Sequence, residues 1–543
     1  TFLVNPMLLQ CICVFGCVVL CLCVCQEFAV HVLMKMFFRM VLFCLFACAF
    51  LSCKSSELFY FSGVTLWDQD QLQKNTSVRQ QNNNELIVST SDSIEEKSNS
   101  LKISGSLRLS LLGGLVNVGG SAKYFQDIKK SHKQARVTLQ YKTTTKFETL
   151  TMSDLANGQV SHPNVFEDDA ATHVVTAILY GAGAYFVFDR ESSEEDKKQV
   201  EREVNLMFNK LKFLTVNAEA SLCMDEKEKA AVEKFSCSVH GDFNLPSNLT
   251  SFNEAVRVYK SLPNMLGENG EHAVPLRVWL YPLVKLDARA SRLQRDISNA
   301  LITRSSETIE SLNQTEMRCS DILKDTAATT FPAMEKQVQD LMQMCSQYKL
   351  DFMKKLGSVL PSIRGGGKEE SSLEDILAAH DKSPFNSKDL DEWLKNKEKE
   401  SDTMKSFVKQ LEKLGAKMDD SLDDLLFDPD VKNVVCFSFP SVDQYDSFLV
   451  KMSSHLKPAG VKDTPGESSD LQVRNINWLS NDTRQTMRKQ LQVFKELKKL
   501  SNSDDTKFIV ASKYDGSHPE ICSYIVCHKP KKCNYTYIVC LFF

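Results

Sequence analysis

Hydrophobic and polar residues alternate in several short segments between residues 55 and 265. The clearest is segment 101–111, where every second position is apolar or glycine: Leu101, Ile103, Gly105, Leu107, Leu109 and Leu111. The positions between them carry Lys, Arg or Ser. Alternation of period two is typical of a strand with one apolar and one polar face. We therefore predict a mainly β-structured region, with segment 101–111 as one of its strands.

A second pair of alternating segments surrounds a charged stretch that favours a short helix, DEKEKAAVEKF. The apolar positions of the first segment are Leu214, Val216, Ala218, Ala220 and Leu222. Those of the second are Phe235, Cys237 and Val239. A further alternation places Val137, Leu139 and Tyr141 on one face of a strand. Each of these patterns also fits an ordinary half-buried strand of a soluble sheet.

Six glycines stand out near these segments. Gly181 and Gly183 interrupt the apolar run 172–189, and the others follow segment 101–111: Gly113, Gly114, Gly119 and Gly120. Glycine adopts backbone angles that other residues avoid, so it marks bends, bulges and turns. We interpret all six as positions where a sheet bends, with ordinary turns as the alternative.

The period changes to that of helices after residue 283. Apolar residues recur at steps of three and four along one stripe: Met334, Val338, Leu341, Cys345, Tyr348 and Phe352. A similar upstream stripe predicts a helix through Leu286, Ala290, Leu293, Ile297 and Leu301. Pro361 and the glycines at 365–367 end this helical unit, and segments 371–379 and 388–414 add helices. Strand-like 431–439, helix-like 483–500 and strand-like 507–512 then predict a small α/β unit.

Composition excludes some function classes. The chain has 543 residues and a formal net charge of −4, which gives no basic surface for a nucleic acid. The 18 cysteines contain no CxxC pair, so a zinc ribbon or a dithiol redox site is not expected. Cys436, inside a predicted strand, is interpreted as a small buried residue. His162, His173 and His240 have no metal-ligand spacing, so we expect no metal, no cofactor and no enzymatic activity.

Both ends of the chain differ from the middle. Residues 7–25 are almost continuously apolar, and a second apolar run at 40–53 follows Lys35 and Arg39. The alternatives are a mistranslated or mis-spliced leader, a signal peptide and a membrane anchor. The Cys- and aromatic-rich tail 521–543 has no evident partner segment to pack against.

Several stretches, in order from about 62 to 516, resemble proteins of the stonustoxin and verrucotoxin family. They include TLWDQDQLQ at 65–73, LLGGLVNVGGSAKY at 111–124, ARVTLQYKTTT at 135–145 and VPLRVWLYPL at 274–283. ATHVVTAILYGAGAYFVFD at 171–189 and SCSVHGDF at 236–243 belong to the same set. No single motif is decisive, but the ordered set is specific.

The resemblance implies an α+β multidomain protein with three modules. We predict a leader at 1–54, a bent-sheet module like those of perforin and the cholesterol-dependent cytolysins at 55–265, and a helical bundle of the focal-adhesion-targeting type at 266–385. A thioredoxin-like domain without a dithiol is predicted at 386–517, and an atypical tail at 518–543. The PRY-SPRY domain with which family toxins usually end is absent from this sequence.

The resemblance also implies a mechanism. In perforin-like modules, helical segments beside the sheet refold into amphipathic β-hairpins that join a transmembrane barrel, and segment 101–111 and the pair 214–222 and 235–243 are the candidate hairpins. The leading hypothesis is therefore a pore-forming protein, secreted or cytosolic, that acts on lipid membranes with a related subunit or as a homo-oligomer. The alternative is a soluble, non-lytic interaction protein that kept the fold. A redox enzyme is disfavoured by the missing dithiol.

Overall fold

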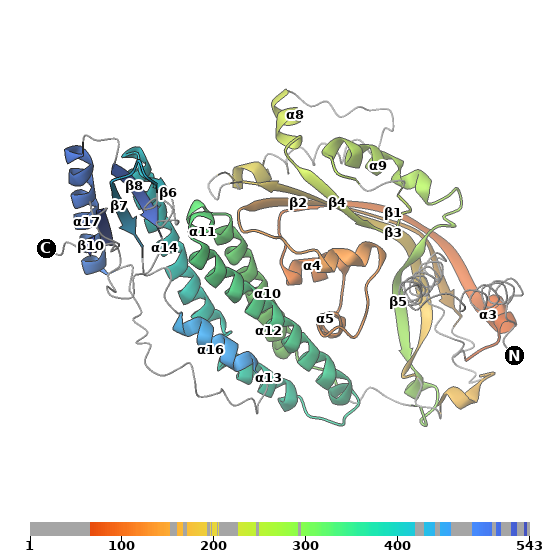
Figure 1. Cartoon of the computed structure of the whole chain (residues 1–543). Helices are drawn as coiled ribbons and strands as arrows, with labels where there is room; N and C mark the ends of the chain where they lie inside the picture. Colours follow the sequence, from red (N-terminus) through yellow and green to blue (C-terminus); the bar gives the residue numbers. More distant parts are fainter. Residues whose placement is uncertain are drawn as a thin grey trace, which may run out of the picture. The chain divides into compact units, whose positions relative to one another are not determined.

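The computed structural model describes residues 66–151, 160–166, 171–192, 196, 198–202, 205, 226–245, 249–290, 295–418, 428–439, 446–457, 480–501, 506–511, 523–528 and 537–539 (Figure 1). The chain divides into two units, Thr1–Asp68 and Gln69–Phe543. Every element below belongs to the second unit. None of the described helices is long and apolar enough to span a bilayer.

An antiparallel sheet forms the first part of this unit. The strands β1 (Thr76–Ser89), β2 (Gln134–Leu150), β3 (His173–Glu191) and β4 (Ser236–Gly241) are neighbours in that order. The strand β5 (Val274–Pro282) also pairs with β3, along a different part of that strand from β4. Figure 1 shows β1, β2 and β3 as long, curved strands that run side by side. Three short helices lie between or beside these strands in the sequence: α3 (Gln69–Asn75) before β1, η2 (Pro163–Phe166) between β2 and β3, and η3 (Leu283–Lys285) after β5.

Irregular pairing occurs where the sequence predicted a bend. The register of β2 against β3 shifts between Thr144 and Phe147, and Gly181 pairs with Thr144 beside this shift. A Cβ at Gly181 would lie 2.0 Å from the carbonyl oxygen of Thr143, so only glycine fits there. Gly183 is also a residue of β3. Gly113, Gly114, Gly119 and Gly120 lie outside the strands, so their interpretation as sheet-bend positions was wrong.

Residues 90–133, which we call the first insertion, connect β1 to β2 and are helical. They contain α4 (Ile94–Leu101), α5 (Gly105–Leu112) and the 3-10 helix η1 (Gly120–Gln126). The prediction of a strand at 101–111 is therefore wrong for this structure. Ser93 and Ser104 accept hydrogen bonds from the backbone N–H groups three residues on, so each helix has its own N-cap, and these caps favour helix over strand.

The two faces of the sheet have different covers. Helix α9 (Phe252–Met265) places Phe252 against Phe188 and Tyr259 against Phe186. Tyr185, which alternates with those β3 residues, stacks instead on Tyr124 of the first insertion. Residues between β3 and β4, called the second insertion, include α8 (Glu226–Val232). The predicted strand at 214–222 falls outside the described residues.

A helical bundle follows the sheet. Its helices are α10 (Asn299–Leu323), α11 (Thr326–Thr330), α12 (Pro332–Arg364), α13 (Ser371–Asp381) and α14 (Ser387–Lys413). All six members of the predicted stripe on α12 are buried, which confirms that prediction. Helix α12 ends at Arg364 with Gly365 as its C-cap, at the predicted glycines, whereas Pro361 lies within the helix. The upstream helix prediction was wrong at Leu286, Ala290 and Ile297, which precede α10, and right at Leu301 within α10, while Leu293 lies outside the described residues.

The C-terminal part is a small α/β domain with sheet order β10-β9-β7-β8-β6. Its strands are β6 (Lys417–Met418), β7 (Asn433–Ser438), β8 (Thr506–Ala511), β9 (Ser523–His528) and β10 (Tyr537–Val539), with helices α16 (Ser447–Leu456) and α17 (Asn481–Leu500). The tail does have a partner segment: β9 pairs with β7 along the whole of that strand. The earlier interpretation was wrong because strand partners separated by about ninety residues leave no local signal.

The order of bent sheet, helical bundle and α/β domain confirms the predicted fold class. The predicted module boundaries after residues 265 and 385 separate elements that pack together. β5 is hydrogen-bonded into the first sheet, and α14 packs against α10 of the bundle. We therefore propose to end the first module after residue 282 and the bundle after residue 413.

Candidate functional site

A buried arginine connects the first insertion to the sheet. Arg136 of β2 is 3 % exposed and forms a bidentate pair with Asp189 of β3, with both N···O distances at 2.7 Å. Its Nη1 also lies 3.0 Å from Asp92 and 2.9 Å from Asp127, which belong to the first insertion. Burial would lower the pKa of Arg136, but the bond to Asp189 and the surrounding carboxylates raise it.

Two more basic side chains complete this group, which we call the Arg136 cluster: Arg136, Lys97, His240, Asp92, Asp127 and Asp189. Lys97 of α4 is 2 % exposed and lies 2.8 Å from Asp92. Nε2 of His240 on β4 lies 2.6 Å from Asp127. Burial would raise the pKa of Asp127, but the bond to His240 and the charge of Arg136 lower it to about 2. Strands β2, β3 and β4 thus all contribute to holding the insertion.

The 3-10 helix η1 adds a second attachment to the sheet. Tyr124 and Tyr185 stack with ring centroids 4.4 Å apart. Asp242, just after β4, accepts hydrogen bonds from the backbone N–H of Ser121 at 2.8 Å and of Gly183 at 2.9 Å. Gly120 has φ +54°, and a Cβ there would lie 2.1 Å from Oδ1 of Asp242. Glycine at 120 therefore permits this close approach.

The opposite side of the insertion packs on the bundle. Gly113, which follows α5, meets Gly357 of α12 so closely that a Cβ on Gly357 would lie 2.3 Å from the Gly113 carbonyl oxygen. Arg364 of α12 donates hydrogen bonds to Ser110 Oγ at 2.8 Å and to the Ser106 carbonyl at 2.7 Å. Leu109, fully buried, joins the same apolar core as the bundle residues. The buried second half of helix α5 is thus packed against another module.

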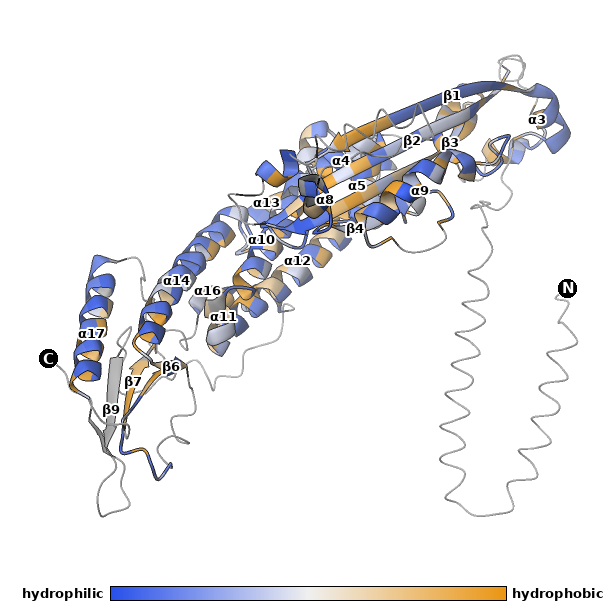
Figure 2. Cartoon of the chain, turned by 90° about the horizontal axis from the view of Figure 1, so that it is seen from above, coloured by the Kyte–Doolittle hydropathy of each residue, from blue (hydrophilic) through white to orange (hydrophobic). Residues whose placement is uncertain are grey.

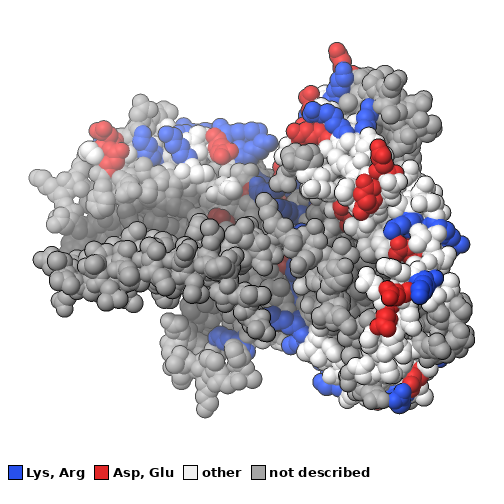
Figure 3. Space-filling model, turned by 90° about the vertical axis from the view of Figure 1, so that its right-hand side faces the viewer, with Lys and Arg blue, Asp and Glu red and all other residues white. Residues whose placement is uncertain are grey.

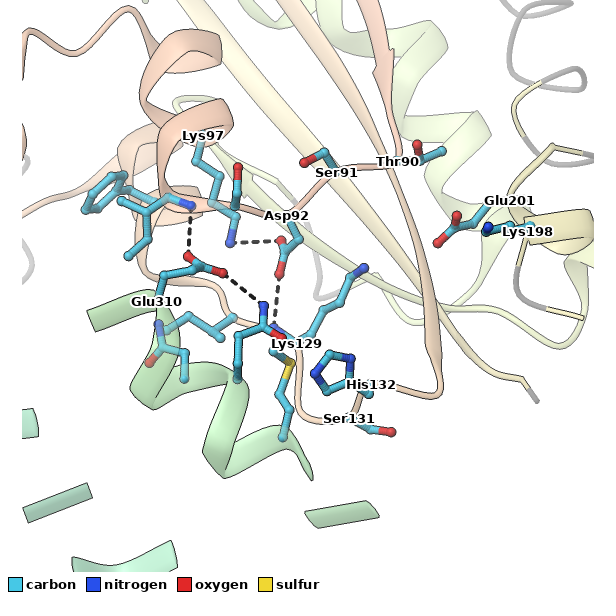
Figure 4. Close-up of a pocket in the computed structure, with 17 residues that line it drawn as sticks. Thr90, Ser91, Asp92, Lys97, Lys129, Ser131, His132, Lys198, Glu201 and Glu310 are labelled. Carbon is cyan, nitrogen blue, oxygen red and sulfur yellow. Dashed lines mark hydrogen bonds and ion pairs between the residues drawn. The ribbon is translucent and has the colours of Figure 1, made fainter. Parts of the chain in front are cut away.

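Helix α10 holds the two ends of the insertion. Glu310 accepts a hydrogen bond from the Ile94 backbone at 3.1 Å, at the start of α4. Asp321 accepts hydrogen bonds from Ser131 Oγ and from the His132 backbone, just before β2. Between these contacts is a polar cavity of about 640 Å³, lined by the first insertion, α10, and Lys198 and Glu201 of the second insertion (Figure 4). The cavity shows that both insertions meet α10 at one place.

The structure places the predicted membrane-insertion residues in three settings. Leu109 and Leu111 are buried, Leu101 and Ile103 are half-buried, and Leu107 is 41 % exposed. Phe235 is buried just before β4, and Val239 is half-buried within it. Leu214, Val216, Ala218, Ala220 and Leu222 lie in a part of the chain that the structure does not describe. The structure therefore brings together only the residues of the first candidate hairpin.

Sequence reasoning did not find the Arg136 cluster. Its members come from four separated stretches of chain, and His240 had been considered only as a possible metal ligand. The one available signal was Arg136 on the polar face of an alternating segment. That face is buried, with Arg136, Thr138 and Gln140 all below 5 % exposed. A polar strand face looks solvent-facing in the sequence whether water or an inserted helix pair covers it.

Nothing in the described residues suggests catalysis by a metal. No group of three or more His, Cys, Asp or Glu side chains in that part of the chain is arranged to hold an ion. Cys436 is 2 % exposed and forms no disulfide. Figure 3 shows positive and negative side chains interspersed over one face of the molecule. The contacts of the site hold the first insertion in place between the sheet and the bundle.

Comparisons with known proteins identify related chains. The family model described as the stonustoxin helical domain matches residues 307–402, and the one described as the thioredoxin-like SNTX domain matches 414–526. Verrucotoxin subunit beta of Synanceia verrucosa is 34 % identical over 460 residues, covering 83 % of this chain and 64 % of that protein. Cytolytic toxin-alpha of Scorpaena plumieri is 34 % identical over 457 residues, with the same coverage of 83 % and 64 %.

A solved stonustoxin structure matches the fold with a TM-score of 0.65 at 29 % sequence identity. The match covers 83 % of this chain and 64 % of the solved one. The chain therefore spans slightly less than two thirds of the length of these relatives.

Proposed function

We propose that this chain, which belongs to the family of the stonustoxin and verrucotoxin subunits, is a cytolytic, pore-forming subunit whose first insertion refolds into a membrane-inserted β-hairpin. The observation that supports this most is the conflict between sequence and structure at 101–111. Its sequence alternates as a strand does, yet the chain there forms the end of α4 and then α5. Lys102, which follows α4, has a φ angle of +57°.

The refolded form would suit this sequence better than the helical one. As a strand, Leu101, Ile103, Leu107, Leu109 and Leu111 would share one face, and Lys102 and Arg108 would share the other. In the helical form the same leucines point in different directions, since Leu107 is 41 % exposed while Leu109 is fully buried. A membrane strand requires about 9–11 residues with such alternation, which segment 101–111 provides.

The second insertion is the proposed source of a second hairpin. It connects β3 to β4 as the first insertion connects β1 to β2, so both insertions extend strands of one sheet. Barrel closure by several subunits would satisfy the backbone groups of the inserted strands in lipid. Because relatives are named as alpha and beta toxin chains, we propose a related subunit as the partner. Secretion followed by action on membranes completes this proposal.

A disulfide across the insertion and the bundle tests the refolding step. Ser131→Cys with Asp321→Cys replaces a hydrogen-bonded pair, and the bond would hold the insertion on α10. We expect the oxidised double variant to release no dye from liposomes and to lyse no red cells, and we expect a reductant to restore both activities. Each assay uses the chain alone and the chain mixed with a related toxin subunit.

Single-cysteine variants are the matched controls, because they change the same side chains without forming the bond. Lysis by the oxidised double variant, with the disulfide verified by mass, would contradict refolding of the first insertion. A further outcome is that the unmodified chain is folded, as judged by circular dichroism, and yet inactive both alone and with the related subunit. In that case a non-lytic interaction protein becomes the better hypothesis.

A charge on the proposed lipid face tests which segment inserts. Leu107 is already 41 % exposed, so Leu107→Lys should leave the folded form intact. In a membrane strand a lysine costs up to about 2–4 kcal/mol per subunit, so we expect lysis to fall by more than tenfold. Leu350→Lys on α12, at a leucine 53 % exposed, is the control and should lyse normally. Equal activity of the two variants would exclude this strand from the bilayer.

A further inference from the structure

Helix α17 of the α/β domain carries a large excess of positive charge. Six of its residues are Lys or Arg, and only Asp482 and Glu496 are acidic. The cations are Arg484, Arg488, Lys489, Lys495, Lys498 and Lys499. Figure 2 shows this helix as mostly hydrophilic beside the hydrophobic strand β7. The excess is local, because the whole chain has a net charge of −4.

The cations are arranged along one side of the helix. At 3.6 residues per turn, Arg484, Arg488, Lys495 and Lys499 fall within a wedge of about 60° that is about 22 Å long. Met487, Leu491 and Phe494 are buried on the adjacent stripe and attach the helix to its sheet, with Phe494 against Phe437 and Phe508. Packing thus fixes which way the basic wedge faces.

The cations of α17 differ from those of α14 in their salt bridges. On α14, Lys395 pairs with Asp391, Lys397 with Glu400 and Lys405 with Asp402. Within the described residues, no salt bridge involves any of the six cations of α17. Lys498 lies 4.5 Å from the centroid of the Phe508 ring, a contact that involves no carboxylate. A rigid row of unbalanced cations is electrostatically complementary to a surface with many negative charges.

The end of the helix adds an apolar contact. Leu500 follows Lys498 and Lys499 directly and is 81 % exposed, more than any other large hydrophobic residue of the described chain. An exposed leucine beside lysines suits the boundary between lipid headgroups and acyl chains, where both kinds of side chain find partners. We propose that the basic wedge of α17 is a docking surface for a membrane that contains anionic lipids, with Leu500, about 100° around the helix axis from Lys499, as an apolar contact at the end of the helix.

Docking by α17 would be a separate step from pore formation. It requires no refolding, because the wedge is already formed, with Arg484, Arg488 and Lys499 exposed and Lys495 half-buried. Each Lys or Arg near an anionic membrane strengthens binding by about fivefold, so four of them are enough for reversible recruitment at moderate ionic strength. The same attraction weakens as salt shortens the screening length.

Sedimentation of the full chain with vesicles tests the docking surface. Vesicles of phosphatidylcholine alone are compared with vesicles that contain phosphatidylserine. We expect binding only to the second kind, with an affinity that falls as salt rises. The double variant Arg488→Glu with Lys499→Glu should bind about thirtyfold more weakly or worse, because it removes two favourable charges and adds two repulsive ones.

The matched control is Lys409→Glu with Lys413→Glu, which makes the same change of net charge on exposed positions of α14. This control should bind nearly as the unmodified chain does. Equal losses in the two variants would show a general charge effect and overturn the proposal, and so would a failure of the unmodified chain to bind phosphatidylserine vesicles. Equal binding to neutral vesicles would overturn it as well.

Dye release measured on the same samples separates this inference from pore formation. Binding without release would leave the docking surface standing and contradict the cytolytic proposal. Release by the α17 variant at high protein concentration, with weakened binding, would support both.

Discussion

Helices α5 and α12 touch each other, yet their sequences relate to their structures in opposite ways. On α12, apolar residues follow the helical period and form one buried stripe. On α5, they follow the period of a strand, and the helix packs on α10 and α12 of the bundle. α12 is helical by its own pattern, whereas α5 is helical because of its caps and its surroundings.

This difference falls in the segment that we propose to refold. A sequence whose local preference agrees with its structure favours a single state. Where the two disagree, contacts with other elements must maintain the observed state. For the first insertion those contacts are the Arg136 cluster, which holds α4 and Asp127 on the sheet, and the Gly113–Gly357 approach, which holds α5 on the bundle. Weakening either should release the first insertion and leave the bundle intact.

The largest effect is expected from Arg136→Met. It leaves Asp92, Asp127 and Asp189 without their central cation in a buried site, which typically costs about 3–5 kcal/mol. Hydrogen exchange of α4 and η1 should accelerate strongly, while α12 exchanges as before. Arg304→Met removes an exposed ion pair on the bundle and should cost less than about 1 kcal/mol. Equal acceleration in α12 would show that the two regions unfold as one unit.

An intermediate effect is expected from Gly357→Ala. The new methyl group would collide with the Gly113 carbonyl, and overpacking of this kind costs about 1–3 kcal/mol. Helix α12 itself should be no weaker, because alanine favours a helix over glycine by about 1 kcal/mol. Faster exchange in α5 alone is therefore the expected result. Gly119→Ala, with no atom within 4 Å of its Cβ, is the control. Unchanged exchange in α5 would mean that the close approach is not a constraint.

The smallest effect on the insertion is expected from mild acid. Asp127 has a pKa of about 2, below its unfolded value of about 3.9, so its stabilisation is present above pH 4 and is lost as pH falls toward 2. Beside Tyr348 of the bundle, burial lowers the pKa of His380 on α13 and of His455 on α16, so protonation of the unfolded chain below about pH 6.5 favours unfolding there. Exchange at pH 5 should thus increase around Tyr348 before it increases in α4. The reverse order would contradict this assignment.

The parts that the sequence predicted are those with regular, local patterns. The α12 stripe, the strand at β7, the helix at α17 and the glycine beside the β3 bulge were all predicted from local features of the sequence. The Arg136 cluster was not, because its charges come together only when three strands and an insertion have assembled. The β9 strand was missed for a related reason, since its partner β7 is remote in the chain. Segment 101–111 was misread because a helix held by its surroundings has no helical period of its own.

The bidentate pair of Arg136 and Asp189 has a consequence for any transition of the first insertion. Both residues belong to the sheet, in directly opposed positions on β2 and β3. Departure of the insertion removes Asp92 and Asp127 but leaves this pair in place, so the arginine keeps a counter-charge throughout. The surface that the insertion vacates is thereby already neutralised at its centre. The same two side chains can bind the docked insertion and, after the insertion leaves, still form an ion pair between β2 and β3.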